Sequence, residues 1–219
     1  MTRSAVGRRL SEQPLRNLGV LGAGAVLVST AAFGGLEPAE DPGAATFAFG
    51  DTVRAAPLDV TIDRVTWVDG ALPGIYLTDD DNRWIGVVAT ISTDHSASLS
   101  SEPAATVALA GVDGLVRPPV DGTDAVLSSD QLLMADSSRL SPMQPGLDYE
   151  VVFLFEQDGD APAPEEVDVV LFGHTWREDA LTGGYSAWRD PTTVARASLP
   201  ARPGGQAQPE DAATDGDDA

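Results

Sequence analysis

Apolar and polar residues alternate along much of this chain, which is the pattern of a β-strand with one buried face. The longest alternating segment covers residues 58–68, where apolar residues occupy even positions up to Ile62 and odd positions from Val65 onward. Because strand side chains alternate between two faces, this change of parity requires one extra residue in the strand. We therefore expect a long strand with a β-bulge near Asp63 and Arg64.

Shorter segments repeat the pattern. Segments 83–93 and 167–176 have apolar residues on both faces and are expected in the middle of a sheet. The other strand candidates are residues 106–110, 147–155 and, more weakly, 193–199, and we expect the last at a sheet edge.

Turn signals separate these segments. Asp-Gly pairs, which suit tight turns, stand at 69–70, 113–114, 121–122 and 158–159. Between residues 47 and 200, no window carries the apolar stripe of an amphipathic helix. The sequence predicts an all-β fold, specifically an immunoglobulin-like antiparallel β-sandwich of seven to nine strands.

A segment without any charged residue, Leu18–Leu36, precedes this region. As a helix it would be about 28 Å long, which is close to the hydrocarbon thickness of a bilayer. Arginines precede it and acidic residues follow it, so the rest of the chain is expected outside the cytoplasm. We favour an uncleaved single-pass membrane anchor. The alternative is a cleaved signal peptide and a secreted protein, because Ser29 and Ala31 suit a cleavage site.

Composition then divides the chain into five parts. They are a basic cytoplasmic segment (1–17), the anchor or signal (18–36), a polar spacer (37–46), the sandwich (47–200) and an acidic tail (201–219). The tail is rich in Pro, Gly, Gln and acidic residues, so we expect it to be disordered.

The charge of the chain excludes several partners and chemistries. Its 34 acidic residues oppose 13 arginines, which gives a net charge of −21 at pH 7. Repulsion from phosphates therefore excludes nucleic acid as a partner. The chain has no cysteine, which excludes disulfides, thiolate metal sites and a lipid-modified cysteine. No motif implies a cofactor.

Three stretches, at residues 52–68, 83–93 and 140–156, resemble a known family. They read "LDVTIDRVTWVD", "RWIGVVATIST" and "LSPMQPGLDYEVVFLFE" at their most characteristic. They are similar to the immunoglobulin-like domain of unknown function of bacterial surface proteins, also labelled telomeric-repeat-binding-factor-like, in its membrane-anchored actinobacterial form. This chain departs from that pattern at Thr93 and Asp94, where the family has Asn. The resemblance implies a membrane-attached or secreted sandwich and transfers no catalytic residue.

An acidic cluster is the first candidate site. Asp79, Asp80 and Asp81 are consecutive and are followed by Asn82. Oxygen ligands suit Ca²⁺, but an EF-hand loop needs alternating ligands and a Gly at its sixth position, where this chain has Trp84. We keep the three aspartates as weak metal candidates and favour a solvated hairpin tip.

The two histidines are weak catalytic candidates. Asp94, His95 and Ser96 combine an acid, a base and a hydroxyl, but neighbours on a strand or turn point apart, whereas a triad must converge. His174 shares a strand face with Phe172 and Trp176, so we expect a structural histidine with a hydrogen-bonded ring.

The stretch from 173 to 191 is expected to be a long loop. It holds Trp176, Tyr185 and Trp188 among charged residues. Aromatic side chains in such a loop either cap an open end of the sandwich or form a binding surface. We favour capping and keep the three aromatic residues as binding-surface candidates.

The leading interpretation is a non-catalytic, membrane-tethered, extracytoplasmic binding or accessory module. Its partners would be the membrane, through Leu18–Leu36, and a cell-envelope protein or a transporter. Two alternatives stay open: a secreted hydrolase that uses acidic residues on a sandwich, and a calcium-dependent surface adhesin-like domain.

Overall fold

A computed structural model describes residues 43–178 and 186–204 of the chain. The strands are β1 (Thr52–Ala55), β2 (Leu58–Asp69), β3 (Arg83–Thr93), β4 (Val107–Ala110), β5 (Val126–Leu127), β6 (Asp130–Leu133), β7 (Tyr149–Gln157), β8 (Glu166–Glu178) and β9 (Ser186–Pro203). The helical structure in these residues is one short 3₁₀ turn, η1 (Pro103–Ala105). The described part of the chain contains no helix that could cross a membrane, and Leu18–Leu36 lies outside it.

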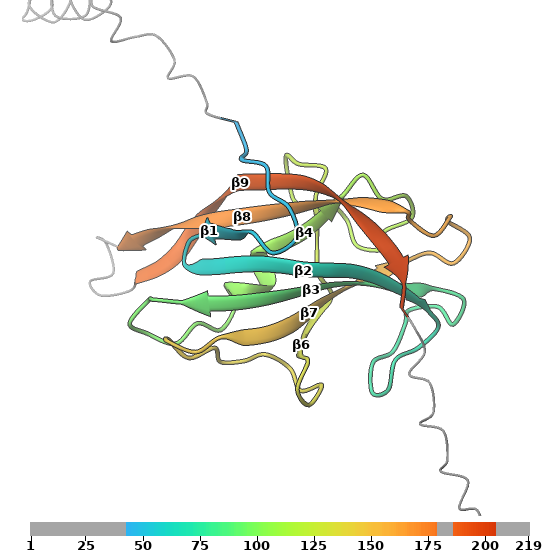
Figure 1. Ribbon diagram of the computed structural model, residues 1–219, viewed down its shortest axis with the longest axis horizontal. Coiled ribbons are helices and arrows are strands. Elements are labelled where there is room, and N and C mark those ends of the chain that lie inside the picture. The colour runs from blue at the N-terminus through green and yellow to red at the C-terminus, as the bar shows by residue number, and fades with distance from the viewer. Residues whose placement is uncertain (1–42, 179–185, 205–219) are drawn as a thin grey trace, which may run out of the picture. The chain divides into compact units, whose positions relative to one another are not determined.

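The nine strands form one sheet in the order β5-β4-β8-β9-β2-β3-β7-β6, with β1 added to β2. The sheet curls so that its first four strands and its last four form two facing halves (Figure 1). The halves are joined where Ala201–Pro203 of β9 pairs with Val65–Trp67 of β2. That pairing is parallel, so the expectation of a purely antiparallel sandwich is wrong at this joint.

The main core lies between the two halves. Alternate residues of β2, β3 and β7 on one side and of β4, β8 and β9 on the other form a single buried cluster. Its largest fully buried side chains include Phe153, Phe155, Ile62, Ile85 and Leu171. Removal of this apolar surface from water is the main source of the stability of the sandwich.

Each outer face of the sheet has a smaller apolar cluster. On the face of β4 and β8, Phe172 and Val170 pack with Ala125 and Val120 of the segment that follows β4. On the face of β3 and β7, Trp84 packs with residues of the loop between β2 and β3. These clusters explain why the sequence of β3 and β8 is apolar on both faces.

Several strand predictions are confirmed. β3 has the predicted bounds, and β2 has a register shift between Ile62 and Arg64, where the bulge was expected. The number of strands in the described residues lies within the predicted range.

The predicted final strand was wrong in length and position. β9 has 18 residues and lies between β8 and β2 rather than at an edge. Its outward side chains include Arg196 and Ser198, which bind Asp168 of β8. Because this outer face is polar, the sequence did not indicate a central strand. The strand also continues to Pro203, beyond the predicted end of the domain at residue 200.

The prediction of a loop is wrong at residues 173–178 and 186–191, whereas residues 179–185 lie outside the described part of the chain. β8 and β9 continue as a paired hairpin, with Trp176 opposite Trp188 and Glu178 opposite Ser186. Tyr185 lies outside the described residues. At the other terminus, Ala45 of the predicted spacer forms a parallel bridge with Ala195.

Candidate functional site: the aromatic end of the sandwich

The two ends of β3 carry the two groups of candidate residues. Asp79–Asn82 comes directly before this strand, and Asp94–Ser96 comes directly after it. An eleven-residue strand is roughly 35 Å long, so these groups lie at opposite ends of the sandwich. We refer to them as the acidic end and the aromatic end.

At the aromatic end, three rings from distant parts of the sequence contact one another. The ring centroids of His95 and Trp176 are 5.0 Å apart, those of His95 and Trp188 are 5.4 Å apart, and those of the two tryptophans are 5.3 Å apart. The rings are tilted or edge-on, which are the favourable arrangements for aromatic pairs. We call these three residues the aromatic cluster.

The hairpin of β8 and β9 positions the two tryptophans. Trp176 and Trp188 are directly opposite each other in the register, so their rings share one face of the hairpin. The hairpin is fixed to the turn between β1 and β2, where the backbone N–H of His174 donates to the carbonyl of Ala56. A Cβ on Gly173 would lie 2.8 Å from Val194, so only glycine permits this close packing.

His95 is held by the backbone after β3. Its N–H donates to the hydroxyl of Thr93 (3.1 Å), and this buried hydroxyl donates in turn to the carbonyl of Pro57 (2.8 Å). The N–H of Ala97 donates to the Nδ1 atom of His95. The ring is thereby oriented toward the hairpin.

The two tryptophans differ in exposure. Trp188 is partly buried against the main core, and its indole Nε1 is buried without a hydrogen-bond partner among the described residues. Trp176 keeps 41% of its surface exposed. Trp188 therefore closes the end of the sandwich, as the capping interpretation expects, while Trp176 presents a ring to solvent.

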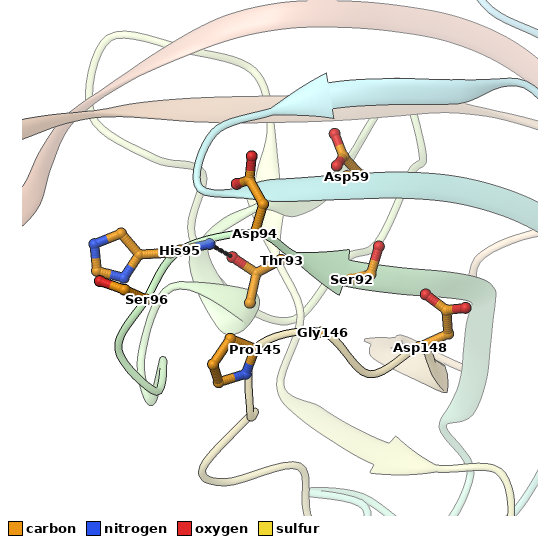
Figure 2. A pocket seen from close by; sticks show the side chains of 9 residues that line it. All are labelled: Asp59, Ser92, Thr93, Asp94, His95, Ser96, Pro145, Gly146 and Asp148. Atoms are coloured by element: carbon orange, nitrogen blue, oxygen red, sulfur yellow. Dashed lines mark hydrogen bonds between the residues drawn. The ribbon is translucent and has the colours of Figure 1, made fainter.

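A hollow of about 470 Å³ has one residue of the aromatic cluster in its lining, and Figure 2 shows the residues that line it. It is lined by Asp59, Ser92, Thr93, Asp94, His95, Ser96, Pro145, Gly146 and Asp148. His95 belongs to both the hollow and the cluster. The lining combines carboxylates and hydroxyls with a comparable amount of apolar surface, so the site offers both hydrogen-bonding groups and apolar contact.

Arg54 neutralises part of this acidic lining. Its guanidinium is 2.9 Å from the carboxylate of Asp59 and 2.7 Å from that of Asp94. The hydrogen bond from Arg54 lowers the pKa of Asp94 below its ordinary value. Figure 2 shows the side chains of Asp94 and His95 pointing apart, as expected of neighbours in sequence.

His174 lies in β8 and is partly buried. Burial lowers the pKa of its ring below the ordinary value, which favours the neutral form. Its Nδ1 atom is buried without a hydrogen-bond partner among the described residues.

The acidic end is organised around a buried carboxylate. One oxygen of Glu156 accepts hydrogen bonds from the N–H and the hydroxyl of Thr78 and from the side-chain amide of Asn82, at 2.6, 2.7 and 2.8 Å. Glu156 and Asn82 are each only 6% exposed. Burial alone would raise the pKa of Glu156, but the hydrogen bonds from Asn82 and Thr78 outweigh it and lower that pKa.

The three candidate metal ligands lie in the loop that this network holds. Asp79 and Asp81 line a hollow of about 350 Å³ with Asp158 and Asp160, and Asp80 is exposed outside that lining. Asp79 accepts from the N–H of Asp81. Within residues 43–178 and 186–204, no three acidic or histidine side chains are grouped so that they could hold a metal ion.

The sequence analysis selected Trp176 and Trp188 as candidates but did not predict the residues that surround them. It treated His95 only as a weak catalytic candidate, and it did not bring Asp59 and Asp148 to the same site. Polar and apolar residues do not alternate at 174–178 or at 186–190, so the sequence carries no clear strand signal for these two segments.

Comparison with known proteins adds two structural likenesses. No family model and no curated protein matches this chain. It is similar to an uncharacterized β-sandwich protein from Clostridium difficile, with 11% identity, coverage of 74% of this chain and 97% of the other, and a TM-score of 0.46. It is also similar to a "putative lipoprotein" from Staphylococcus aureus, with 12% identity, 72% and 95% coverage, and a TM-score of 0.41. At TM-scores below 0.5, neither likeness bears on the function of this chain.

Proposed function

We propose that this protein is a non-catalytic binding module of the cell envelope. In this proposal it has an immunoglobulin-like fold, is tethered by Leu18–Leu36 with its sandwich outside the cytoplasm, and binds its partner at the aromatic end. One observation carries the binding site: an exposed indole, Trp176, contacts the ring of His95, and His95 lines a hollow of about 470 Å³ together with carboxylates and hydroxyls. Exposed aromatic residues beside polar groups are typical of binding surfaces.

The location rests on the sequence. Leu18–Leu36 has no charged residue, and the arginines that precede it favour a cytoplasmic N-terminus. Protease added to intact cells should therefore digest the sandwich, whereas a protein tagged at its N-terminus should keep the tag. Survival of the sandwich in intact cells and its digestion only after lysis would contradict the location.

Binding is tested with the full chain in detergent micelles and with cell envelopes washed free of lipid. The micellar protein should sediment with the envelope material, and Trp176→Ala should reduce the sedimented fraction several-fold. Tyr76→Ala is the matched control, because Tyr76 is 88% exposed and lies in the loop before β3, at the acidic end. Equal loss in both variants, or no loss in either, would contradict the aromatic end as the binding site.

A further inference from the structure

The residues that line the hollow beside the aromatic cluster indicate the chemical class of its ligand. The volume of the hollow, about 470 Å³, lies within the usual range of small-molecule sites, roughly 300–1,000 Å³. An ionised carboxylate only accepts hydrogen bonds, and a serine hydroxyl both accepts and donates. A ligand that complements Asp148, Ser92 and Ser96 must donate several hydrogen bonds and also accept some. Molecules with many hydroxyl groups have this property.

The charge of the lining excludes anions. Asp59, Asp94 and Asp148 face the hollow, and Arg54 is the cation that contacts the first two. The excess of negative charge repels phosphates and acidic sugars. Arg54 already forms ion pairs with Asp59 and Asp94, so a positive charge on the ligand is not required to neutralise these two carboxylates.

The packing of the aromatic cluster disfavours a cationic ligand as well. An aromatic cage holds a cation between its rings, within about 6 Å of each ring centroid. Here the centroids are 5.0–5.4 Å from one another, so the rings fill the space between themselves. What the cluster offers is the outer face of Trp176, held in place by Trp188 and His95.

A flat exposed indole next to hydrogen-bonding groups fits one class of ligand. A sugar ring has an apolar C–H face, which packs on an aromatic ring, and an edge of hydroxyls, which donate to carboxylates. We propose that the aromatic end binds a neutral saccharide, with one ring against Trp176 and neighbouring hydroxyls bonded to Asp148 and the serines of the hollow. This inference rests on the proposed binding function and adds the chemical class of the ligand.

The test is titration calorimetry on the full chain in a polyoxyethylene detergent, which contains no sugar. The neutral probes are the pentamers of N-acetylglucosamine, glucose and mannose in β- and α-linked forms. Trigalacturonate is the anionic probe, and tetramethylammonium and hexa-arginine are the cationic probes. At least one neutral pentamer should bind with an affinity that hardly changes between low and high salt, because no net charge is paired.

Variants then assign the binding to the site. Trp176→Ala should weaken it about tenfold or more, and Trp176→Phe should recover part of the loss because it restores a flat ring. Asp148→Asn should weaken it about threefold to tenfold, because hydrogen bonds to an ionised acceptor are the stronger ones. Tyr76→Ala should stay within about twofold of the wild type.

Three results would contradict the proposal that the ligand is a neutral saccharide. One is stronger binding of a cationic probe with steep salt dependence, another is binding of the anionic probe, and the third is no binding of any neutral pentamer up to about 10 mM. If envelope sedimentation still depends on Trp176 in that third case, the binding module stands and only the ligand class is wrong. If sedimentation is also independent of Trp176, the proposed function fails with it.

Discussion

The two ends of β3 both present polar side chains in a hollow, yet they differ in where those side chains find partners. At the acidic end, two buried side chains bind groups of their own chain: Glu156 accepts from Thr78 and Asn82, and the Asn82 side-chain oxygen accepts from the N–H of Gly159. At the aromatic end, Thr93 is satisfied in the same way, but Trp176 and Asp148 remain exposed.

This difference suggests different roles for the two ends: the acidic end contributes to stability, and the aromatic end is the proposed binding site. A buried carboxylate with several donors from its own chain stabilises a fold, because leaving those donors without a partner is costly. An exposed indole held by two other rings gains less from the fold and is free for a partner. The acidic end, although it draws attention in the sequence, is therefore the structural end.

The largest effect on stability is expected at Glu156. Glu156→Ala leaves the buried side-chain amide of Asn82 and the partly buried donors of Thr78 without their acceptor, so the free energy of unfolding should fall by about 2–4 kcal/mol. Urea denaturation at pH 7 measures this. The control is Glu156→Gln, whose amide oxygen can accept the same bonds without a charge, and it should lose about half as much. Equal losses in the two variants would show that the network adds little.

The second effect sharpens the comparison within the aromatic cluster. Trp188→Ala removes a partly buried indole from the edge of the core and should cost about 2 kcal/mol, below the roughly 3–5 kcal/mol of a fully buried tryptophan. Trp176→Ala should cost no more than about 1 kcal/mol, because 41% of this side chain is already exposed. Urea melts of both variants, read together with their saccharide affinities, should show stability at Trp188 and binding at Trp176. A larger stability loss for Trp176→Ala would reverse these roles.

Local pattern and distant pairing differ in how far the sequence predicts them. β3 and the bulge of β2 were predicted because strand alternation is a property of consecutive residues. The parallel joint of β9 with β2 was not, since it pairs residues more than 130 positions apart in the sequence. The central place of β9 was missed as well, because its polar outer side chain Arg196 is explained only by ion pairs with Asp168 and Asp124.

The same limit applies to the candidate site. Trp176 and Trp188 could be selected by residue type, but their contact with His95 depends on how the hairpin of β8 and β9 packs against the turn between β1 and β2. The alternation of polar and apolar residues along the sequence contains no information about that packing.

The third effect uses pH to isolate Glu156. Its pKa in the folded protein is lower than the ordinary value of 4.5, so the unfolded chain takes up this proton first as the pH falls. The stability from ionised Glu156 is therefore complete above pH 4.5 and is lost as the pH falls through the lower folded pKa. The difference in unfolding free energy between wild type and Glu156→Gln should be constant from about pH 8 to 6 and should shrink below pH 4.5. Asp94, Asp124 and Asp168, whose pKa values are also lowered, are present in both proteins and cancel in the difference. A difference that grows with acid would contradict the direction of the shift.

The smallest expected effect concerns calcium at the acidic end. The carboxylate of Asp79 already accepts a hydrogen bond from the backbone N–H of Asp81, and Asn82 and Glu156 hold the end of this loop. A ligand that binds only the native state raises its stability by an amount that grows with ligand concentration. If these aspartates do not bind Ca²⁺ appreciably, thermal melting of the full chain should coincide in excess EDTA and in about 5 mM CaCl₂, apart from a small general ionic effect that MgCl₂ reproduces. The variant with Asp79, Asp80 and Asp81 all changed to Asn then separates specific from general effects. A rise of several degrees with Ca²⁺ alone, absent from this variant, would make the acidic end a ligand site and remove the contrast with the aromatic end.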